Sequence, residues 1–123
     1  MANILVVDDE APVRNLLNDV LEKEGYTVFT AETGVEASTI YNSNDIDLII
    51  TDLVMPEKGG IDLIMELKKQ DPDIKVIAIS GGGGITGRFD YLPIAKLVGA
   101  TEIIAKPFQV TEIRAQVAKM LAA

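Results

Sequence analysis

The chain has 123 residues, which is enough for one domain with one substantial hydrophobic core. Its 19 acidic and 11 basic residues give a formal net charge of −8, which argues against direct nucleic-acid binding because phosphate contacts need an excess of Lys and Arg. The chain contains neither cysteine nor histidine, which excludes disulfides, zinc sites built on these residues and a serine–histidine–aspartate triad.

Five short apolar runs predict the β-strands of the chain. They cover residues 3–7 (NILVV), 26–31 (YTVFTA), 47–51 (DLIIT), 75–80 (KVIAIS) and 102–105 (EIIA). Four of them are rich in Val and Ile and apolar on both faces, which is typical of a parallel sheet that helices cover on both sides. The more mixed run at 26–31 is suited to an edge strand.

Amphipathic segments between these runs predict helices. The first helix has Pro12 near its start and Gly25 just past its end, positions at which helices favour these two residues. Its predicted apolar face comprises Val13, Leu16, Leu17, Val20 and Leu21. Residues 34–43 and 60–70 predict two further helices with weaker apolar faces.

Two more helices are predicted in the last third of the chain. One begins near residue 91, with Asp90 as its N-cap and Pro93 in its first turn, where the missing N–H costs little. The other has the apolar face Val110, Ile113, Val117 and Leu121. Strands and helices therefore alternate five times, and right-handed crossovers between them predict an α/β fold with a doubly wound five-stranded parallel sheet.

The remaining sequence features bear on domain number and location. No interdomain linker and no internal repeat is recognisable, so we predict that residues 1–123 form one domain. No apolar run reaches membrane-spanning length and no signal peptide opens the chain. We therefore expect a soluble, cytoplasmic protein with no membrane insertion.

Polar residues stand where the predicted strands end. Asp8 and Asp9 follow the first strand and Asp52 follows the third. Ser80 ends the fourth strand and Lys106 follows the fifth. Because ligands of a doubly wound sheet bind at the carboxyl ends of its strands, we expect these side chains to share one site.

Three carboxylates at one edge of a sheet repel one another, and this repulsion raises the pKa of at least one of them. A hard divalent cation removes the conflict, and Mg²⁺ suits carboxylate ligands, with Mn²⁺ as an alternative. One aspartate can then act as a covalent nucleophile on phosphorus, while Lys106 and Ser80 hold the phosphoryl oxygens. The acidic edge therefore predicts a metal-dependent phosphoryl site.

Each of these motifs taken alone has a plain structural explanation. Asp8 and Asp9 could be an exposed strand end, Asp52 a residue that begins a loop, and Lys106 a strand terminator. Their occurrence together at one edge favours the functional explanation. The glycine run at 81–84 is not a phosphate-binding P-loop, because no Lys-Ser/Thr pair follows it.

The motifs VVDDE, IITDLVMPEKGG, AISG and AKPF resemble those of response-regulator receiver domains, the phosphoacceptor half of two-component signalling. They follow the order and spacing of that family over essentially the whole chain. The resemblance implies a flavodoxin-like (βα)5 fold with strand order 2-1-3-4-5. It also implies a cis peptide bond between Lys106 and Pro107.

The same resemblance assigns roles to individual residues. Asp52 is the expected phosphoryl acceptor, and the expected Mg²⁺ ligands are Asp8, Asp9, Asp52 and the backbone carbonyl of Val54. Ser80 is the expected switch hydroxyl and Lys106 the expected partner of the phosphoryl group and the carboxylates.

Two positions depart from the family's usual pattern. Ile103 stands where the family usually has Tyr or Phe, so we expect an aliphatic switch surface there. Val54 and Gly82 occupy positions that tune hydrolysis of the phosphoryl group in the family, and neither side chain can orient water. Our hypothesis is a comparatively long-lived phosphorylated form.

The resemblance implies a single-domain response regulator that performs no substrate turnover. A sensor histidine kinase or a phosphotransfer protein would donate the phosphoryl group. The switch surface, made of helix 4, strand 5 and helix 5, would then bind an unknown downstream protein. A phosphorelay shuttle, or a receiver excised from a larger regulator or a hybrid kinase, would use the same residues.

Two functions from other classes are weaker alternatives. An aspartate-based phosphatase would share the nucleophile and the metal, but it usually carries a second Asp where this chain has Val54. A flavin-binding module would need a hydroxyl-rich phosphate loop and more aromatic side chains than this sequence offers.

Overall fold

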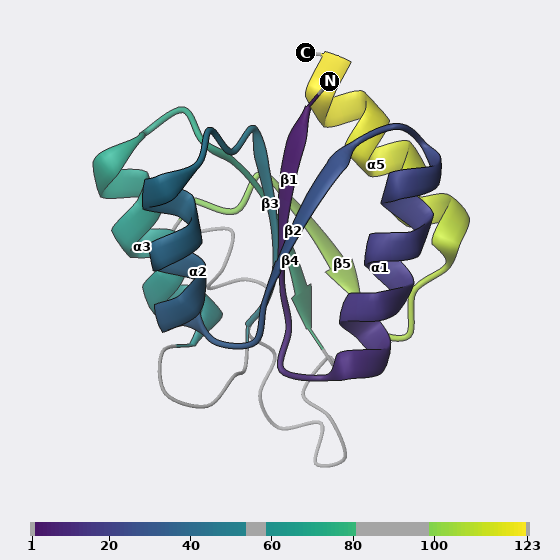
Figure 1. Cartoon of the computed structure of the whole chain (residues 1–123), viewed down its shortest axis with the longest axis horizontal. Coiled ribbons are helices and arrows are strands. Elements are labelled where there is room, and N and C mark those ends of the chain that lie inside the picture. The colour runs from purple at the N-terminus through teal and green to yellow at the C-terminus, as the bar shows by residue number, and fades with distance from the viewer. Residues whose placement is uncertain (1, 54–58, 81–98, 123) are drawn as a thin grey trace.

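The structure of the chain, a computed structural model, describes residues 2–53, 59–80 and 99–122 (Figure 1). Strands and helices alternate along these ranges. In chain order they are β1 Asn3–Val7, α1 Ala11–Lys23, β2 Thr27–Ala31, α2 Gly34–Ser43, β3 Leu48–Asp52, α3 Gly60–Gln70, β4 Lys75–Ser80, β5 Glu102–Ala105 and α5 Val110–Ala122. Within the described residues no helix is both long enough and apolar enough to cross a membrane.

The five strands form one parallel sheet in the order β2-β1-β3-β4-β5. The predicted α/β fold and strand order 2-1-3-4-5 are therefore confirmed. Val7 of β1 pairs with Thr51 of β3, and Asp52 of β3 pairs with Ile79 of β4. The carboxyl ends of these strands therefore lie together along one edge of the sheet. That shared edge is where the residues following β1, β3 and β5 meet.

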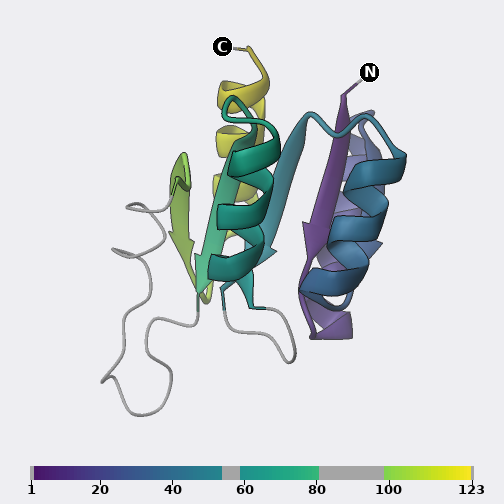
Figure 2. The ribbon, with the colours of Figure 1, turned by 90° about the vertical axis from the view of Figure 1, so that its left-hand side faces the viewer.

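Helices cover both faces of the sheet, with α1 and α5 on one face and α2 and α3 on the other (Figure 1). Figure 2 looks onto the face that carries α2 and α3. Alternate residues of a strand point to opposite faces, so Leu5 and Val7 join the core under α2 and α3, whereas Ile4 and Val6 join the core under α1 and α5. Two buried cores explain why the strand sequences are apolar throughout.

Element boundaries differ from the predictions by single residues. The third strand runs over Leu48–Asp52 rather than 47–51. Asp47 lies just before it, where its N–H donates to the carbonyl of Asn3 and its carboxylate accepts the N–H of Asn3 at 2.7 Å. The second strand begins at Thr27, one residue later than predicted. The shift makes Asp52 the last residue of β3.

The predicted apolar faces of the first and last helices need one correction each. Leu16 is 42% exposed, so its assignment to the buried face of α1 was wrong. The burial predicted for Leu17, Val20 and Leu21 is confirmed, and these three residues define a narrower apolar stripe. On α5 Met120 is also buried, one helical turn from Val117, although it was not part of the predicted face. The helix predicted near residue 91 lies outside the described residues.

Candidate functional site

The carboxyl edge of the sheet collects three aspartates. Asp52 is the last residue of β3, and Asp8 and Asp9 follow β1. One carboxylate oxygen from each of the three lies within 4.8 Å of the other two. The structure therefore brings together the three side chains predicted to form a metal site.

The three aspartates differ in their exposure to solvent. Asp8 is 2% exposed and Asp52 is 7% exposed, whereas Asp9 is open to solvent. Backbone hydrogen bonds hold the strand ends, since the N–H of Asp8 donates to Ala31 and the N–H of Leu53 donates to Ile79. The result is a pair of buried carboxylates with a third at the solvent-facing side.

Lys106 lies among these carboxylates, directly after β5. Its Nζ is 3.0 Å from Oδ2 of Asp8 and 3.5 Å from Oδ2 of Asp52. It is also 3.5 Å from Oε2 of Glu10. The Lys106–Pro107 peptide bond is cis, which confirms that expectation. The Glu10 side chain is 59% exposed and contacts the lysine from the solvent side.

Burial and the close contacts between Asp8 and Lys106 shift the pKa values of both groups. Burial is the main cause that raises the pKa of Asp8, opposed by the hydrogen bonds that it accepts from the Glu10 N–H and from Lys106. Burial alone would lower the pKa of Lys106, but its hydrogen bond to Asp8 and the charges of Asp52, Asp8 and Glu10 raise it. The lysine is therefore a stable cation that neutralises part of the negative charge.

Gly60 positions the end of β3. A Cβ at this residue would collide with the carbonyl oxygen of Asp52 and would lie 2.7 Å from the Cα of Leu53. The N–H of Gly60 donates to the carbonyl of Leu53 at 3.0 Å. Only glycine allows α3 to begin this close to the backbone of Asp52. Gly60 thus has a structural role in the turn after β3.

Other predicted residues are described only in part. Ser80 ends β4 opposite Ala105, but its side chain is outside what the structure describes. Val54 and Gly82 lie in the ranges that are not described. Ile103 is half-buried in β5, where it pairs with Ala78. The roles of these residues stay predictions.

The donor set of the edge fits a hard divalent cation. All three candidate ligands are carboxylates, and oxygen-only coordination suits Mg²⁺, which keeps several of its water molecules. Asp9 faces solvent, so such waters have access to the site. Among the residues that the structure describes, Lys106 lies within 3.5 Å of carboxylates of Asp8, Asp52 and Glu10 and does not balance all the negative charge there, so a divalent ion would reduce the remaining repulsion.

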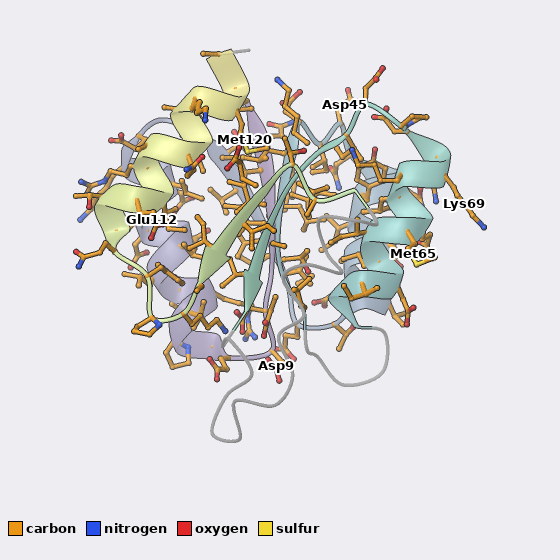
Figure 3. The ribbon with its side chains drawn as sticks, turned by 180° about the vertical axis from the view of Figure 1, so that it is seen from behind. Asp9, Asp45, Met65, Lys69, Glu112 and Met120 are labelled. Carbon is orange, nitrogen blue, oxygen red and sulfur yellow. The ribbon has the colours of Figure 1, made fainter. Side chains whose placement is uncertain are left out.

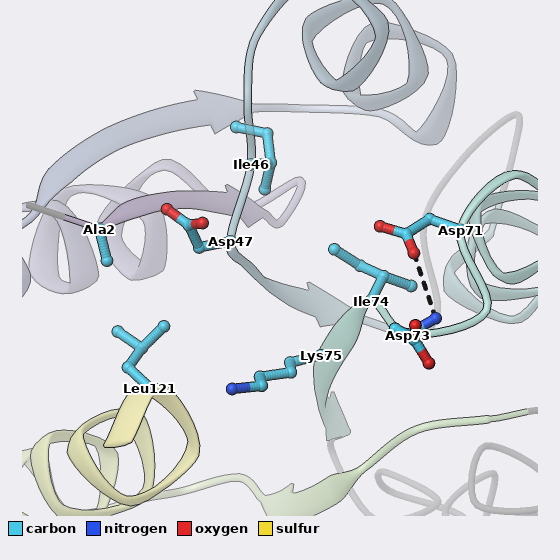
Figure 4. Close-up of a pocket in the computed structure, with 8 residues that line it drawn as sticks. All are labelled: Ala2, Ile46, Asp47, Asp71, Asp73, Ile74, Lys75 and Leu121. Atoms are coloured by element: carbon cyan, nitrogen blue, oxygen red, sulfur yellow. Dashed lines mark hydrogen bonds between the residues drawn. The ribbon is translucent and has the colours of Figure 1, made fainter. Parts of the chain in front are cut away.

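A hollow lies at the opposite edge of the sheet, near the amino ends of β3 and β4 (Figure 4). It has a volume of about 580 Å³ and shares no residue with the acidic site. Several of its polar groups are bonded within the fold, since Asp71 accepts the N–H of Asp73 and Lys75 Nζ donates to the carbonyl of Met120. Asp9 and Asp45, labelled in Figure 3, mark the two opposite edges.

Comparison with known proteins gives one consistent family. The family model for the response regulator receiver domain matches residues 4–118. The chain is 38% identical over 118 residues to sporulation initiation phosphotransferase F of Bacillus subtilis, covering 96% of this chain and 92% of that protein. It is 35% identical over 121 residues to response regulator SaeR of Staphylococcus aureus, covering 98% of this chain and 51% of that protein.

Solved structures agree with the sequence comparisons. A response regulator receiver domain protein from Clostridium thermocellum superposes with a TM-score of 0.88 at 32% identity, covering 99% of this chain and 95% of that one. The response regulator TrrA from Thermotoga maritima, solved in complex with Mg²⁺ and BeF, gives a TM-score of 0.82 at 36% identity, covering 98% of this chain and 99% of that one.

Proposed function

The chain belongs to the response regulator receiver domain family, and from that premise we propose that Asp52 accepts a phosphoryl group. Mg²⁺ would be held by Asp8, Asp9, Asp52 and the backbone carbonyl of Val54, with Mn²⁺ as a substitute. The observation that carries the proposal is the approach of three carboxylates to within 4.8 Å, beside a lysine that follows a different strand.

The proposed reaction is a phosphoryl transfer between two proteins. A carboxylate oxygen of Asp52 attacks phosphorus, a P–O bond forms, and the P–N bond to the donor's phosphohistidine breaks. Mg²⁺, when bound, would neutralise part of the negative charge on the phosphoryl group during transfer. Asp8 and Asp9 hold the ion, and Lys106 is already 3.5 Å from Oδ2 of Asp52, within reach of a phosphoryl oxygen there.

The proposed output is a change of protein binding. The phosphoryl group adds about two negative charges at Asp52. Lys106 contacts Asp8, Asp52 and Glu10, so a new anion at Asp52 competes for the same ammonium group. A shift of Lys106, together with Ser80 as the switch hydroxyl, would alter the surface around Ile103 and α5.

The comparisons support two settings for this switch. Similarity to phosphotransferase F over 92% of its length supports a carrier that passes the phosphoryl group to another protein. The chain spans about half of SaeR, which supports a receiver unit of a larger regulator. In both settings residues 1–123 act as one cytoplasmic domain whose partners are a histidine kinase or phosphotransfer protein and a downstream protein, without substrate turnover.

Intact-mass spectrometry tests the proposed function. The protein is incubated with MgCl₂ and a small acyl phosphate, and one phosphoryl adduct is expected. The adduct should be absent from Asp52→Asn and absent with a chelator, but present in Asp45→Asn, which changes an exposed aspartate at the opposite edge. An adduct that survives in Asp52→Asn contradicts the proposal, and sustained hydrolysis of a phosphomonoester would indicate a phosphatase instead.

A further inference from the structure

Arg14 is a half-buried cation that the phosphoryl-transfer scheme above does not use. It belongs to α1, and its side chain is only 14% exposed. Its Nη1 donates to the backbone carbonyl of Asp8 at 2.9 Å, and its Nη2 lies 3.2 Å from Oε1 of Glu32. Arg14 therefore bridges the loop after β1 and the loop after β2.

The contact of Arg14 with Asp8 is to the main chain, unlike that of Lys106. Lys106 binds the Asp8 carboxylate, whereas Arg14 binds the carbonyl of the peptide group that joins Asp8 to Asp9. Because a peptide group is planar, fixing that carbonyl also fixes where the backbone of Asp9 begins. Arg14 is thus placed to determine the direction of the Asp9 side chain.

Asp9 needs such support more than the other two aspartates. Asp8 accepts hydrogen bonds from the Glu10 N–H and from Lys106, and Asp52 lies in the last pair of the β3–β4 ladder. Asp9 is exposed, and no hydrogen bond or ion pair holds its side chain within the ranges that the structure describes. The position of its carboxylate depends on the backbone that carries it.

We propose that Arg14 is a positioning residue for the Mg²⁺ site. Its hydrogen bond holds the Asp8–Asp9 peptide group in place, and this keeps the Asp9 carboxylate beside those of Asp8 and Asp52. This inference rests on the proposed function, because it takes Mg²⁺ as the ligand. Among the described residues, Arg14 bonds the Asp8 carbonyl and the Glu32 carboxylate rather than a carboxylate of the site, so its role is one of positioning.

Glu32 anchors the far end of the clamp. Its carboxylate holds Nη2 of Arg14, and its N–H donates to Oε1 of Glu36 at 2.7 Å. The N–H of Glu36 donates to Oγ1 of Thr33, the N-cap of α2. Glu32 is 68% exposed, so water screens its ion pair and we expect it to be the weaker half of the clamp.

Two roles for Arg14 predict opposite changes in Mg²⁺ affinity. If Arg14 acted only through its positive charge, its removal would lower the repulsion of Mg²⁺ and binding would become tighter. If it positions the site, its removal weakens binding, and residues that orient metal ligands typically contribute about 10- to 100-fold in affinity. A variant that keeps the charge therefore separates the two roles, since it should leave Mg²⁺ affinity unchanged if only the charge matters and weaken it if Arg14 positions the site.

The experiment measures Mg²⁺ affinity of the full chain from backbone amide shifts in an NMR titration with MgCl₂. Arg14→Lys keeps the charge but cannot bind two acceptors in a fork, so we expect its dissociation constant to rise about tenfold. Glu32→Gln should give a smaller rise. Arg114→Lys, an exposed arginine on α5, is the matched control and should bind as the wild type does.

A spectroscopic readout reports on the clamp itself. The carbonyl ¹³C shift of Asp8, measured without Mg²⁺, should move in Arg14→Lys, because the hydrogen bond to that carbonyl is altered, and should stay unchanged in Arg114→Lys. At saturating MgCl₂ the adduct rate of Arg14→Lys should return to that of the wild type, because the variant changes occupancy of the site. Urea unfolding with a chelator measures stability separately.

The outcomes are distinguishable. Unchanged or tighter Mg²⁺ binding by Arg14→Lys overturns the positioning role, as does a loss of stability with an unchanged dissociation constant. If Arg14→Lys does not fold, Glu32→Gln decides: an unchanged affinity with an unmoved Asp8 carbonyl shift overturns the proposal. If the wild type itself binds no Mg²⁺, the proposed function fails together with this inference.

Discussion

Replacement of Asp8 by asparagine tests the electrostatics of the acidic edge in the absence of metal. The carboxylate oxygens lie within 4.8 Å of one another, and unit charges at that distance repel by about 3.5 kcal/mol at an effective dielectric constant of about 20. The substitution removes two such repulsions, one with Asp9 and one with Asp52. Because Asp9 is exposed, salt and water screen its charge, and its repulsion of Asp8 is weaker than that of Asp52.

The same substitution also removes an attraction. Lys106 Nζ lies 3.0 Å from the Asp8 carboxylate. Opposite unit charges at this distance attract by about 5.5 kcal/mol at the same effective dielectric constant, before the cost of burying them is subtracted. Lys106 keeps Asp52 and Glu10 as partners, so it is not left unpaired. Repulsion and attraction nearly cancel, and the burial cost of an ionised Asp8 then decides the sign.

We therefore expect Asp8→Asn to raise the free energy of unfolding by about 1 kcal/mol at neutral pH in the presence of a chelator. An amide oxygen can still accept the Glu10 N–H, which now donates to Oδ1 of Asp8 at 2.9 Å. The assay is urea unfolding, with Asp45→Asn as the exposed control that should stay close to the wild type. A variant less stable than the wild type would refute the reasoning, because the ion pair would then outweigh repulsion and burial.

The pH dependence of this difference has a definite sign. Burial raises the pKa of Asp8 above its ordinary value of 3.8, so the fold favours the protonated acid. The contribution of Asp8 to the free energy of unfolding is therefore favourable below pH 3.8, and it is lost as the pH rises through the raised pKa. Asparagine is neutral throughout, so the advantage of the variant should be full at neutral pH and shrink on acidification. An advantage that grows on acidification contradicts the argument.

Three further predictions concern glycine, lysine and leucine positions. Gly60→Ala should destabilise the protein by about 2 kcal/mol in urea unfolding, because its Cβ meets the β3 backbone, whereas Gly59→Ala, whose nearest contact is 3.4 Å, should be tolerated. Lys106→Met should lower the Mg²⁺ dissociation constant several-fold in an NMR titration, because the lysine competes with the metal for a carboxylate; weaker binding would contradict this. Leu17→Ala should cost about 3 kcal/mol and Leu16→Ala under about 1 kcal/mol, since they are 1% and 42% exposed; equal costs would contradict the packing of α1.

The sheet and its acidic edge could be predicted because few arrangements are open to such a sequence. Apolar runs that alternate with amphipathic segments give a parallel sheet, and the carboxyl ends of its strands share one edge. Asp8, Asp52 and Lys106 each end or follow a strand, so their approach follows from topology alone. Their distances depend on side-chain conformation, which no pattern of residues specifies.

Contacts made across loops could not be predicted in this way. Arg14 reaches Asp8 and Glu32 because the first turn of α1 lies beside the loop after β2, and nothing in the spacing of these residues indicates that approach. The exposure of Leu16 was missed for a related reason, since helical periodicity defines a broad apolar sector while the neighbouring elements decide how much of it is covered.

The central claim is that Asp52 carries the phosphoryl group, and chemical trapping tests it most directly. The protein is phosphorylated with an acyl phosphate and MgCl₂, reduced with borohydride, digested, and sequenced by tandem mass spectrometry, so that a phosphorylated aspartate is read as homoserine. We predict homoserine at position 52 and none at positions 8 and 9. Homoserine at position 8 or 9, or its absence from position 52 in a protein that carries the adduct, would contradict the account.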